Sequence, residues 1–227
     1  MRVLAIDTAL EACSAAVLDA EQGAVLASES IPMTRGHAEA LMPLIARVMS
    51  DAMLEFLDLD RIAVTVGPGS FTGLRVGVAA ARGIAVAAGK PAVGLTTLAA
   101  FAAPYIAADD VSPLIAAIDA RNDQVYMQLF GSAGRSLISP RIAPVRDAVR
   151  VATRGPARLV GSGAAMIAAA WPSNEQRPSV VDAARAPRID WVAQLGAAAA
   201  QALSLPKPLY LRAPDAQPQD GAQLPRR

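Results

Sequence analysis

The sequence is poor in the residues that build metal and redox sites. Its 227 residues include a single histidine, His37, and a single cysteine, Cys13. One cysteine excludes an internal disulfide and a zinc site made of several cysteines, and it fits a reducing compartment. Acidic and basic residues nearly balance, at a formal net charge of +1, so the chain has no surplus of positive charge for binding nucleic acid unaided.

Long uninterrupted apolar runs are also missing. The N-terminal "MRVLAID" reaches Asp7 too soon for the apolar region of a signal peptide. The most apolar later stretch, "VGVAAARGIAVAAG", contains Arg82 and is shorter than a membrane span requires. Hydrophobic residues still make up 53% of the chain, enough for a large core and too many for a disordered protein. We therefore expect a cytoplasmic protein with no membrane segment.

The two halves of the sequence show the same order of elements. The first half predicts strands at "RVLAID" and "CSAAVLD", an amphipathic helix at "HAEALMPLIARVMSDAM", a strand, turn and helix around "VTVGPGSFTGLRVG", and a strand and helix at "PAVGLTTLAAFA". The second half restarts at "SPLIAAIDARNDQVYMQLFG", where Asp119 corresponds to Asp7, and continues with "ARLVGSGAAMIAAAW". This duplication predicts an α/β protein of two tandem lobes, with mixed sheets flanked by helices.

The join between the halves falls near "APYIAADDVSP". We expect an N-terminal, partner-binding lobe at residues 1–106, a C-terminal lobe at residues 107–215 and a mobile tail at residues 216–227. The segment "RIDWVAQLGAAAAQAL" predicts a further helix that packs back on the sheets.

The glycine-rich turn in "VTVGPGSFTGLRVG" raises the question of a phosphate loop. A strand, a glycine turn and a helix can direct backbone N–H groups at an anion. Leu74 and Arg75, however, stand where a Walker loop needs lysine and a hydroxyl residue, and Thr72 breaks the dinucleotide-binding glycine pattern. Pro68 also removes one N–H donor. The turn therefore predicts a tight reversal of the chain. Its structural residues are Gly67, Pro68, Gly69, Phe71 and Gly73.

Five motifs follow one another over nearly the whole chain. They are "IDTALEACSAAVLD", "HAEALMPLI", "VGPGSFTGLRVG", "AIDARNDQVYMQLF" and "PLYLRAPDA". Together they resemble the TsaB family, also called YeaZ, of bacterial tRNA threonylcarbamoyladenosine synthesis. The resemblance implies two tandem actin-like lobes of the ribonuclease H-like (ASKHA) type, the layout shared by actin, sugar kinases and acetate kinase.

The resemblance also implies partners. In that family the protein pairs with the related catalytic subunit TsaD, and the ATPase TsaE joins them. This implies a non-catalytic scaffold or activating subunit of the complex that forms N6-threonylcarbamoyladenosine in tRNA next to the anticodon. It further implies no activity for the chain alone, a homodimer when TsaD is absent, and contact with tRNA through the complex.

The resemblance predicts no metal site and no catalytic residue. TsaD-type subunits place a His-x-x-x-His metal pair on the helix after the Pro-Ala strand, and the matching positions here are Thr97 and Phe101, which cannot replace histidines. His37 could act as a general base or metal ligand beside Glu39, but the second histidine of an H-E-x-x-H helix is missing. A polar residue at a helix start, packing at a subunit contact, is the favoured interpretation.

The aspartates that end the two hairpin strands are the candidates for contact with a nucleotide. In kinases of this layout such residues help to place magnesium and water, and the group here is Asp7, Thr8 and Asp119. The alternative is that the carboxylates cap turns. Ala9 and Arg121 put side chains where a phosphate needs space. We therefore expect no cofactor of its own and at most weak or partner-dependent binding of ATP or ADP.

Two helices carry apolar or small side chains, which are typical of a core or of a helix–helix interface. In the TsaB family the equivalent helices contact TsaD or a second copy of the protein. The candidate interface residues are His37, Leu41, Ile45, Met49, Arg75, Val78, Ala79 and Arg82.

Three functions stay open at this point. The first is the scaffold described above. The second is an autonomous kinase-like, ATP-dependent phosphotransferase, which the two aspartate hairpins favour. The third is a metallopeptidase of the glycoprotease type, which the single histidine opposes.

Overall fold

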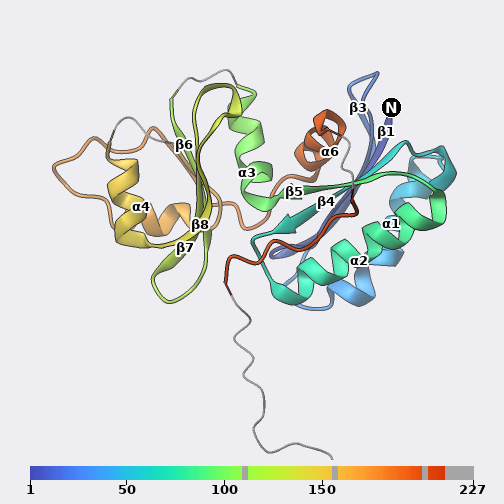
Figure 1. Cartoon of the computed structure of the whole chain (residues 1–227), viewed down its shortest axis with the longest axis horizontal. Helices are drawn as coiled ribbons and strands as arrows, with labels where there is room; N and C mark the ends of the chain where they lie inside the picture. The colour runs from blue at the N-terminus through green and yellow to red at the C-terminus, as the bar shows by residue number, and fades with distance from the viewer. Residues whose placement is uncertain (109–111, 155–157, 201–203, 213–227) are drawn as a thin grey trace, which may run out of the picture.

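The computed structural model describes residues 1–108, 112–154, 158–200 and 204–212, and within these ranges the chain forms two five-stranded sheets. The sheets and their helices make two lobes that lie side by side (Figure 1). The predicted tail, residues 216–227, lies outside the described ranges.

The first lobe has the strand order β3-β2-β1-β4-β5. Strand β1 pairs antiparallel with β2 and parallel with β4, so the sheet is mixed, as predicted. Helices α1 and α2 cover one face and the late helix α6 covers the other. The bounds are β1 (Arg2–Asp7), β2 (Ala12–Asp19), β3 (Ala24–Pro32), α1 (His37–Asp51), η1 (Phe56–Asp58), β4 (Arg61–Gly67), α2 (Phe71–Ala88), β5 (Ala92–Thr96) and α6 (Ile189–Ala198).

The second lobe repeats this order as β8-β7-β6-β9-β10. Helices α4 and α5 lie on one face of its sheet and α3 lies on the other. The bounds are α3 (Thr97–Ile106), β6 (Leu114–Asp119), β7 (Gln124–Phe130), η2 (Ser132–Gly134), β8 (Ser136–Pro144), α4 (Val145–Ala152), β9 (Arg158–Val160), α5 (Ala164–Ala169) and β10 (Val180–Asp182). The internal duplication is therefore confirmed, although β3, β8, α4 and β10 were not predicted.

Helices α3 and α6 lie between the two sheets and contact each other (Figure 1). Helix α6 packs on β1 and β4 so closely that a Cβ atom on Gly196 would overlap the side chain of Ala63. Arg61 of β4 donates hydrogen bonds to carbonyls at the end of α6, including that of Gly196 at 2.8 Å. The expectation that this helix packs back on the sheets is confirmed, and it packs on the sheet of the opposite half.

Helix α2 is the one helix of the described ranges that is long and apolar enough to cross a membrane, at a mean hydropathy of 1.3 over 18 residues. It is longer than the apolar run in the sequence because it begins at Phe71, ahead of that run. Its side chains Leu74, Val78 and Ala81 are buried in the first lobe, as in the core helix of a globular protein.

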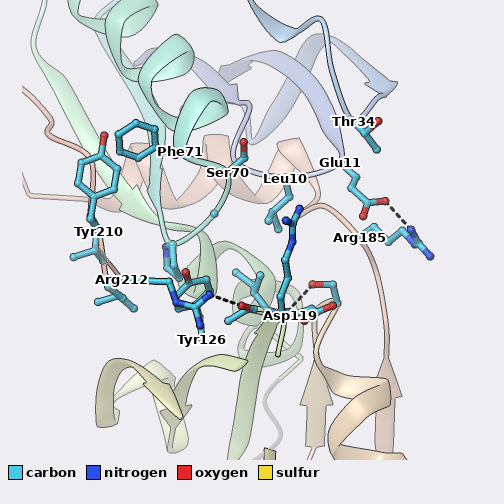
Figure 2. A pocket seen from close by; sticks show the side chains of 18 of the residues that line it. Leu10, Glu11, Thr34, Ser70, Phe71, Asp119, Tyr126, Arg185, Tyr210 and Arg212 are labelled. Atoms are coloured by element: carbon cyan, nitrogen blue, oxygen red, sulfur yellow. Dashed lines mark hydrogen bonds and ion pairs between the residues drawn. The ribbon is translucent and has the colours of Figure 1, made fainter. Parts of the chain in front are cut away.

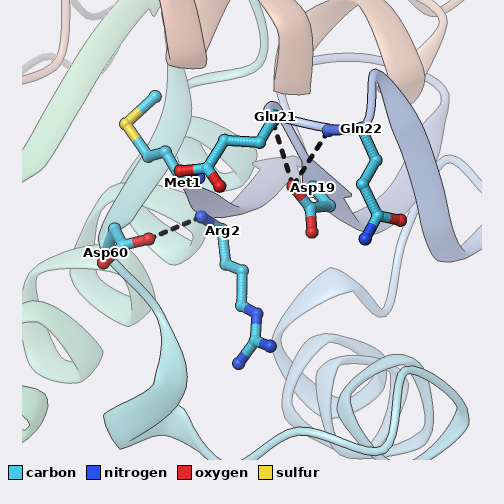
Figure 3. A network of polar contacts seen from close by, with 6 residues as sticks. All are labelled: Met1, Arg2, Asp19, Glu21, Gln22 and Asp60. Carbon is cyan, nitrogen blue, oxygen red and sulfur yellow. Dashed lines mark hydrogen bonds and ion pairs between the residues drawn. The ribbon is translucent and has the colours of Figure 1, made fainter.

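The start of β1 is held by a network of polar contacts (Figure 3). The N-terminal ammonium of Met1 donates to Glu21 at 2.7 Å, and the backbone N–H of Arg2 donates to Asp60 at 2.7 Å. Asp19 in turn accepts from the backbone of Glu21 at 3.0 Å. These contacts tie β1 to the β2–β3 turn and to the segment before β4, so they serve the fold.

Candidate functional site

A cleft of about 680 Å³ lies between the lobes and is the candidate functional site. Its walls are the β1–β2 turn and the glycine turn of the first lobe, the β6–β7 turn of the second lobe, and residues 209–212 (Figure 2). The site therefore combines segments that are far apart in the sequence.

The β1–β2 turn of the first lobe is closed. Asp7 is fully buried, and its Oδ1 atom accepts from the hydroxyl of Thr65 and from the backbone N–H of Ala9 at 3.2 Å. The hydroxyl of Thr8, also buried, donates to the carbonyl of Gly73 at 2.7 Å. Neither Asp7 nor Thr8 lines the cleft. Of the three candidates for nucleotide contact, these two thus lie behind the wall of the site.

The glycine turn explains why this region is closed. A Cβ atom on Gly69 or Gly73 would lie less than 3.0 Å from the carbonyl oxygen of Ala9 or Thr8. Gly67 has a φ of 117°, a left-handed conformation that favours glycine. The backbone N–H of Ser70 donates to the carbonyl of Ala9 at 2.7 Å. The glycines therefore allow two stretches of backbone to meet.

The turn residues Phe71 and Pro68 also line the cleft, and the Gly67–Pro68 peptide bond is cis. The ring of Phe71 lies under the guanidinium of Arg75, 3.8 Å from ring centroid to Cζ. This cation–π contact fixes the first turn of α2 at the edge of the cleft.

Burial raises the pKa of the Asp7 carboxyl to about 6, although the hydrogen bonds from Thr65 and Ala9 and the nearby His37 favour the charged form. Within the described ranges, the second carboxyl oxygen of Asp7 has no hydrogen-bond partner. A desolvated carboxylate with one free oxygen is costly, so protonation stabilises the folded state.

The β6–β7 turn of the second lobe is open. Asp119 is exposed and lines the cleft, where its carboxylate accepts from the backbone N–H of Arg121 at 2.7 Å. Its own backbone N–H donates to the hydroxyl of Ser162 at 3.1 Å. Residues Arg121, Asn122 and Asp123 all have positive φ values, 62°, 51° and 55°. Three such residues in a row make a strained turn at the site.

Several polar groups of the two turns are already engaged within the protein. At the first turn, the polar groups of Thr8 and Ala9 already bond the glycine turn. At the second, the carboxylate of Asp119 repels an anion, and the carbonyl of Ala120 accepts from Arg212 at 2.9 Å. Weak or partner-dependent binding of ATP or ADP stays a prediction.

The only histidine of the sequence, His37, is largely buried at the start of α1. Its Nε2 atom lies 3.1 Å from the carbonyl oxygen of Leu10, which belongs to the β1–β2 turn. In the part of the chain that the structure describes, no three metal-ligating residues gather in one place. The geometry of His37 is that of a residue that fixes a turn.

Of the eight candidate interface residues, His37 is largely buried, and the other seven divide into two groups. Four of them lie in the core of the first lobe and are at most 4% exposed: Leu41, Ile45, Met49 and Val78. Arg75, Ala79 and Arg82 lie on the exposed face of α2, where they line a shallow hollow together with Val78 and Pro208. An interface role stays a prediction for all of them, and the structure leaves only the second group accessible to a partner.

Several residues of the cleft were not predicted. Those with polar side chains include Tyr126, Ser162, Arg185, Tyr210 and Arg212. Tyr210 and Arg212 belong to the "PLYLRAPDA" motif, so a signal was present in the sequence. Nothing local to that motif shows that it reaches the cleft from the far end of the chain.

Two lobes with one shared sheet order around a cleft define the actin-like class, which includes sugar kinases. The chain matches the family model described as TsaD, tRNA N6-adenosine threonylcarbamoyltransferase, over residues 25–211. It resembles the solved structure of YeaZ from Pseudomonas aeruginosa with a TM-score of 0.78 and 30% identity, covering 92% of this chain and 99% of that one.

Two curated relatives carry the name tRNA threonylcarbamoyladenosine biosynthesis protein TsaB. The protein from Haemophilus influenzae is 31% identical over 174 residues, 72% of each chain. The protein from Escherichia coli is 37% identical over 126 residues, 56% of this chain and 53% of that protein. The chain belongs to the TsaB family, also called YeaZ, within the wider family that the TsaD model describes.

Proposed function

We propose that this chain is a non-catalytic subunit that activates the formation of N6-threonylcarbamoyladenosine in tRNA, in the cytoplasm. Membership of the TsaB family implies a role in this biosynthesis. The proposed partner is a TsaD-type catalytic subunit, and a TsaE-type ATPase joins the complex. The match to the TsaD family model supports a pairing of two related folds.

The single observation that carries the proposal is which residues stand at the positions of the expected metal-binding histidines. The positions of the expected histidine pair are taken by Thr97 and Phe101, which α3 buries at the back of the second sheet. The one histidine of the chain is turned to the carbonyl of Leu10. Neither the hydroxyl of Thr97 nor the ring of Phe101 replaces an imidazole ligand. A partner that brings the metal site accounts for this donor set.

The exposed face of α2 is the surface that we assign to the partner. Ala79 and Gly83 are exposed and small, and a side chain on Gly83 would meet nothing within 4 Å. Val86 on the same helix is 71% exposed. Small residues allow a second helix to approach closely, and an exposed valine gains from being covered. Without the TsaD-type subunit, the same face can pair with a second copy of the chain.

The test is reconstitution of the modification from purified subunits. The TsaD-type and TsaE-type proteins, tRNA and a source of the threonylcarbamoyl group are combined with and without this chain, and the modified nucleoside is measured by mass spectrometry. We expect modification only when the chain is present. Equal modification in its absence would overturn the proposal.

A pair of variants tests whether the exposed face of α2 binds the partner. Ala79→Arg places a large charged side chain on the exposed face of α2, and we expect it to abolish both complex formation and tRNA modification while the chain stays folded. Ala169→Arg, an exposed alanine at the end of α5, is the matched control and should retain both. Titration calorimetry with ATP, for the chain alone and for the complex, tests the expected weak or partner-dependent nucleotide binding.

A further inference from the structure

The segment of residues 204–212, named the C-terminal strap here, follows α6 and runs along the first lobe to the cleft. The backbone N–H of Leu209 donates to the carbonyl of Val66 at 2.7 Å, next to the end of β4. The side chains of Leu205 and Leu209 pack on the core of the first lobe, and Pro206 is buried beside Gly94 of β5. This half of the strap is anchored on the first lobe.

Tyr210 attaches the strap to the start of α2. Its ring lies 5.0 Å from the ring of Phe71, centroid to centroid, and its hydroxyl accepts from Nε of Arg75 at 3.1 Å. Pro208 lines the hollow on the exposed face of α2 together with Arg75. The strap therefore contacts both the cleft and the helix face that we assign to the partner.

The side chain of Arg212 reaches from the strap on the first lobe to the second lobe. Its guanidinium donates to the carbonyl of Ala120 at 2.9 Å and to the side-chain oxygen of Gln124. Ala120 begins the β6–β7 turn directly after Asp119, and Gln124 is the first residue of β7. A forked contact from one charged group to two acceptors is stronger and more directional than a single neutral hydrogen bond.

The opposite side of the cleft has a weaker bridge. Arg185 of the second lobe pairs with Glu11 of the first at 2.8 Å, and both side chains are exposed, by 75% and 44%. Solvent screens such a pair, so it contributes little to holding the lobes. Figure 2 shows Tyr210 and Arg212 along one side of the site and the Glu11–Arg185 pair along the other. The strap thus supplies the stronger polar connection at the mouth of the cleft.

We propose that the C-terminal strap is an interlobe latch, in which Leu209 and Tyr210 are anchored on the first lobe and Arg212 holds the β6–β7 turn of the second. Helices α3 and α6, packed on each other between the sheets, form the connection about which the lobes move when Arg212 lets go. Arg212 is a positioning residue that sets the width of the cleft. This proposal does not depend on the proposed function.

The test measures the distance between the lobes by pulsed electron spin resonance. Cys13 is the only cysteine and is fully buried, so Cys13→Ala gives a background for a labelled pair at Gln22→Cys and Ser173→Cys, exposed sites on the two lobes. We expect Arg212→Ala to shift the distance distribution to longer values and to broaden it. Arg212→Lys keeps the charge without the fork, so its shift should be intermediate.

Two further variants keep the test decisive. Gln124→Ala removes one acceptor from the other lobe and should cause part of the same shift, whereas Arg146→Ala removes an exposed arginine of α4 away from the cleft and should cause none. Hydrogen exchange at the amide of Leu209 should stay slow in Arg212→Ala, because the anchor on the first lobe is retained. An unchanged distance distribution in Arg212→Ala, or an equal shift in Arg146→Ala, would refute the latch.

Discussion

The two hairpin turns that face the cleft have the same place in the repeated fold and opposite surroundings. In the first lobe, Asp7 at the end of β1 is fully buried and separated from the cleft. In the second lobe, Asp119 at the end of β6 is exposed and lines it. One duplicated position has become a core residue in one copy and a surface residue in the other.

The difference arises from where the two glycine turns touch the hairpins. In the first lobe, Gly69 and Gly73 approach the carbonyls of Ala9 and Thr8, which follow the aspartate and therefore enclose it. In the second lobe, Gly161 approaches the carbonyl of Ala117, which precedes the aspartate. Because the glycine turn contacts the hairpin before Asp119, the carboxylate of Asp119 stays exposed to water. The two hairpins therefore differ in which carbonyl the glycine turn approaches, and their aspartates differ in exposure.

The largest effect should come from filling the space between the backbones of the first lobe. A Cβ atom at Gly73 would meet the carbonyl oxygen of Thr8 at less than 3.0 Å, so Gly73→Ala should lower the free energy of unfolding by about 3 kcal/mol or more. In the second lobe, the tightest neighbour of a Cβ at Gly163 is a side-chain methyl of Val125 at 3.0 Å, so Gly163→Ala should cost only about 1–2 kcal/mol. Urea unfolding measures both.

The control for this pair is Gly83→Ala on the exposed face of α2, where a side chain would meet nothing within 4 Å. Alanine favours a helix over glycine, so this variant should gain about 0.5–1 kcal/mol. Equal losses at Gly73 and Gly163 would contradict the difference in packing between these two positions.

The next largest effect is a difference between the two aspartates in how they make the stability of the protein depend on pH. The folded state raises the pKa of the Asp7 carboxyl from its ordinary value of 3.8 to about 6, so between these pH values the folded chain binds more protons than the unfolded chain does. The contribution of Asp7 to stability is therefore fully present below about pH 4 and is lost as the pH rises through 6. By linkage, the raised pKa corresponds to a loss of about 3 kcal/mol in the free energy of unfolding.

Asp7→Asn has no carboxyl to titrate, so the stability of the unsubstituted protein relative to this variant should fall between pH 4 and pH 7. Chemical unfolding across this range measures the difference. Asp119→Asn is the control in the second lobe, and it should keep the pH slope of the unsubstituted protein because Asp7 is intact. A flat difference for Asp7→Asn would show that the carboxyl is not desolvated.

The smallest effect comes from the hydroxyls that tie each turn to its glycine loop. Thr8→Val removes a buried donor from the carbonyl of Gly73 and should cost about 1–2 kcal/mol. Ser162→Ala removes the acceptor for the backbone N–H of Asp119, which water can replace, so its cost should stay below about 0.5 kcal/mol. Thermal unfolding compares the two. A larger loss for Ser162→Ala would mean that the second turn is closed as well.

Much of the fold was predictable because apolar residues recur with the period of each element. Strand β1 and helix α2 were predicted from an apolar run and from glycine and proline punctuation. Strand β3, with its alternating exposed and half-buried residues and polar "SES" stretch, lacks such a signal because it lies at the edge of the sheet. Helix α4 was missed although Val145, Ala148, Val149 and Ala152 follow the helical period and are buried.

The candidate site was less predictable because it depends on contacts between distant segments. Asp7 and Asp119 each follow an isoleucine at the end of an apolar strand, so the sequence does not distinguish them. Only the close approach of Gly69 and Gly73 to the first hairpin shows that Asp7 and Thr8 are enclosed. Arg212 contacts Ala120 across 92 positions of sequence, and a local motif carries no information on such a pairing. For Ile45, the helical period indicated burial, and it could not distinguish a core from an interface.

The placement of α6 has a consequence for how the chain folds during synthesis. Strand β5 ends at Thr96, whereas α6, which covers the apolar side chains of Val3, Ala5 and Val93 on the back of the first sheet, begins at Ile189. The ribosome therefore makes nearly the whole second lobe before the helix that completes the first one. Until α6 is made, the apolar back of the nascent first sheet lacks the helix that covers it in the folded protein.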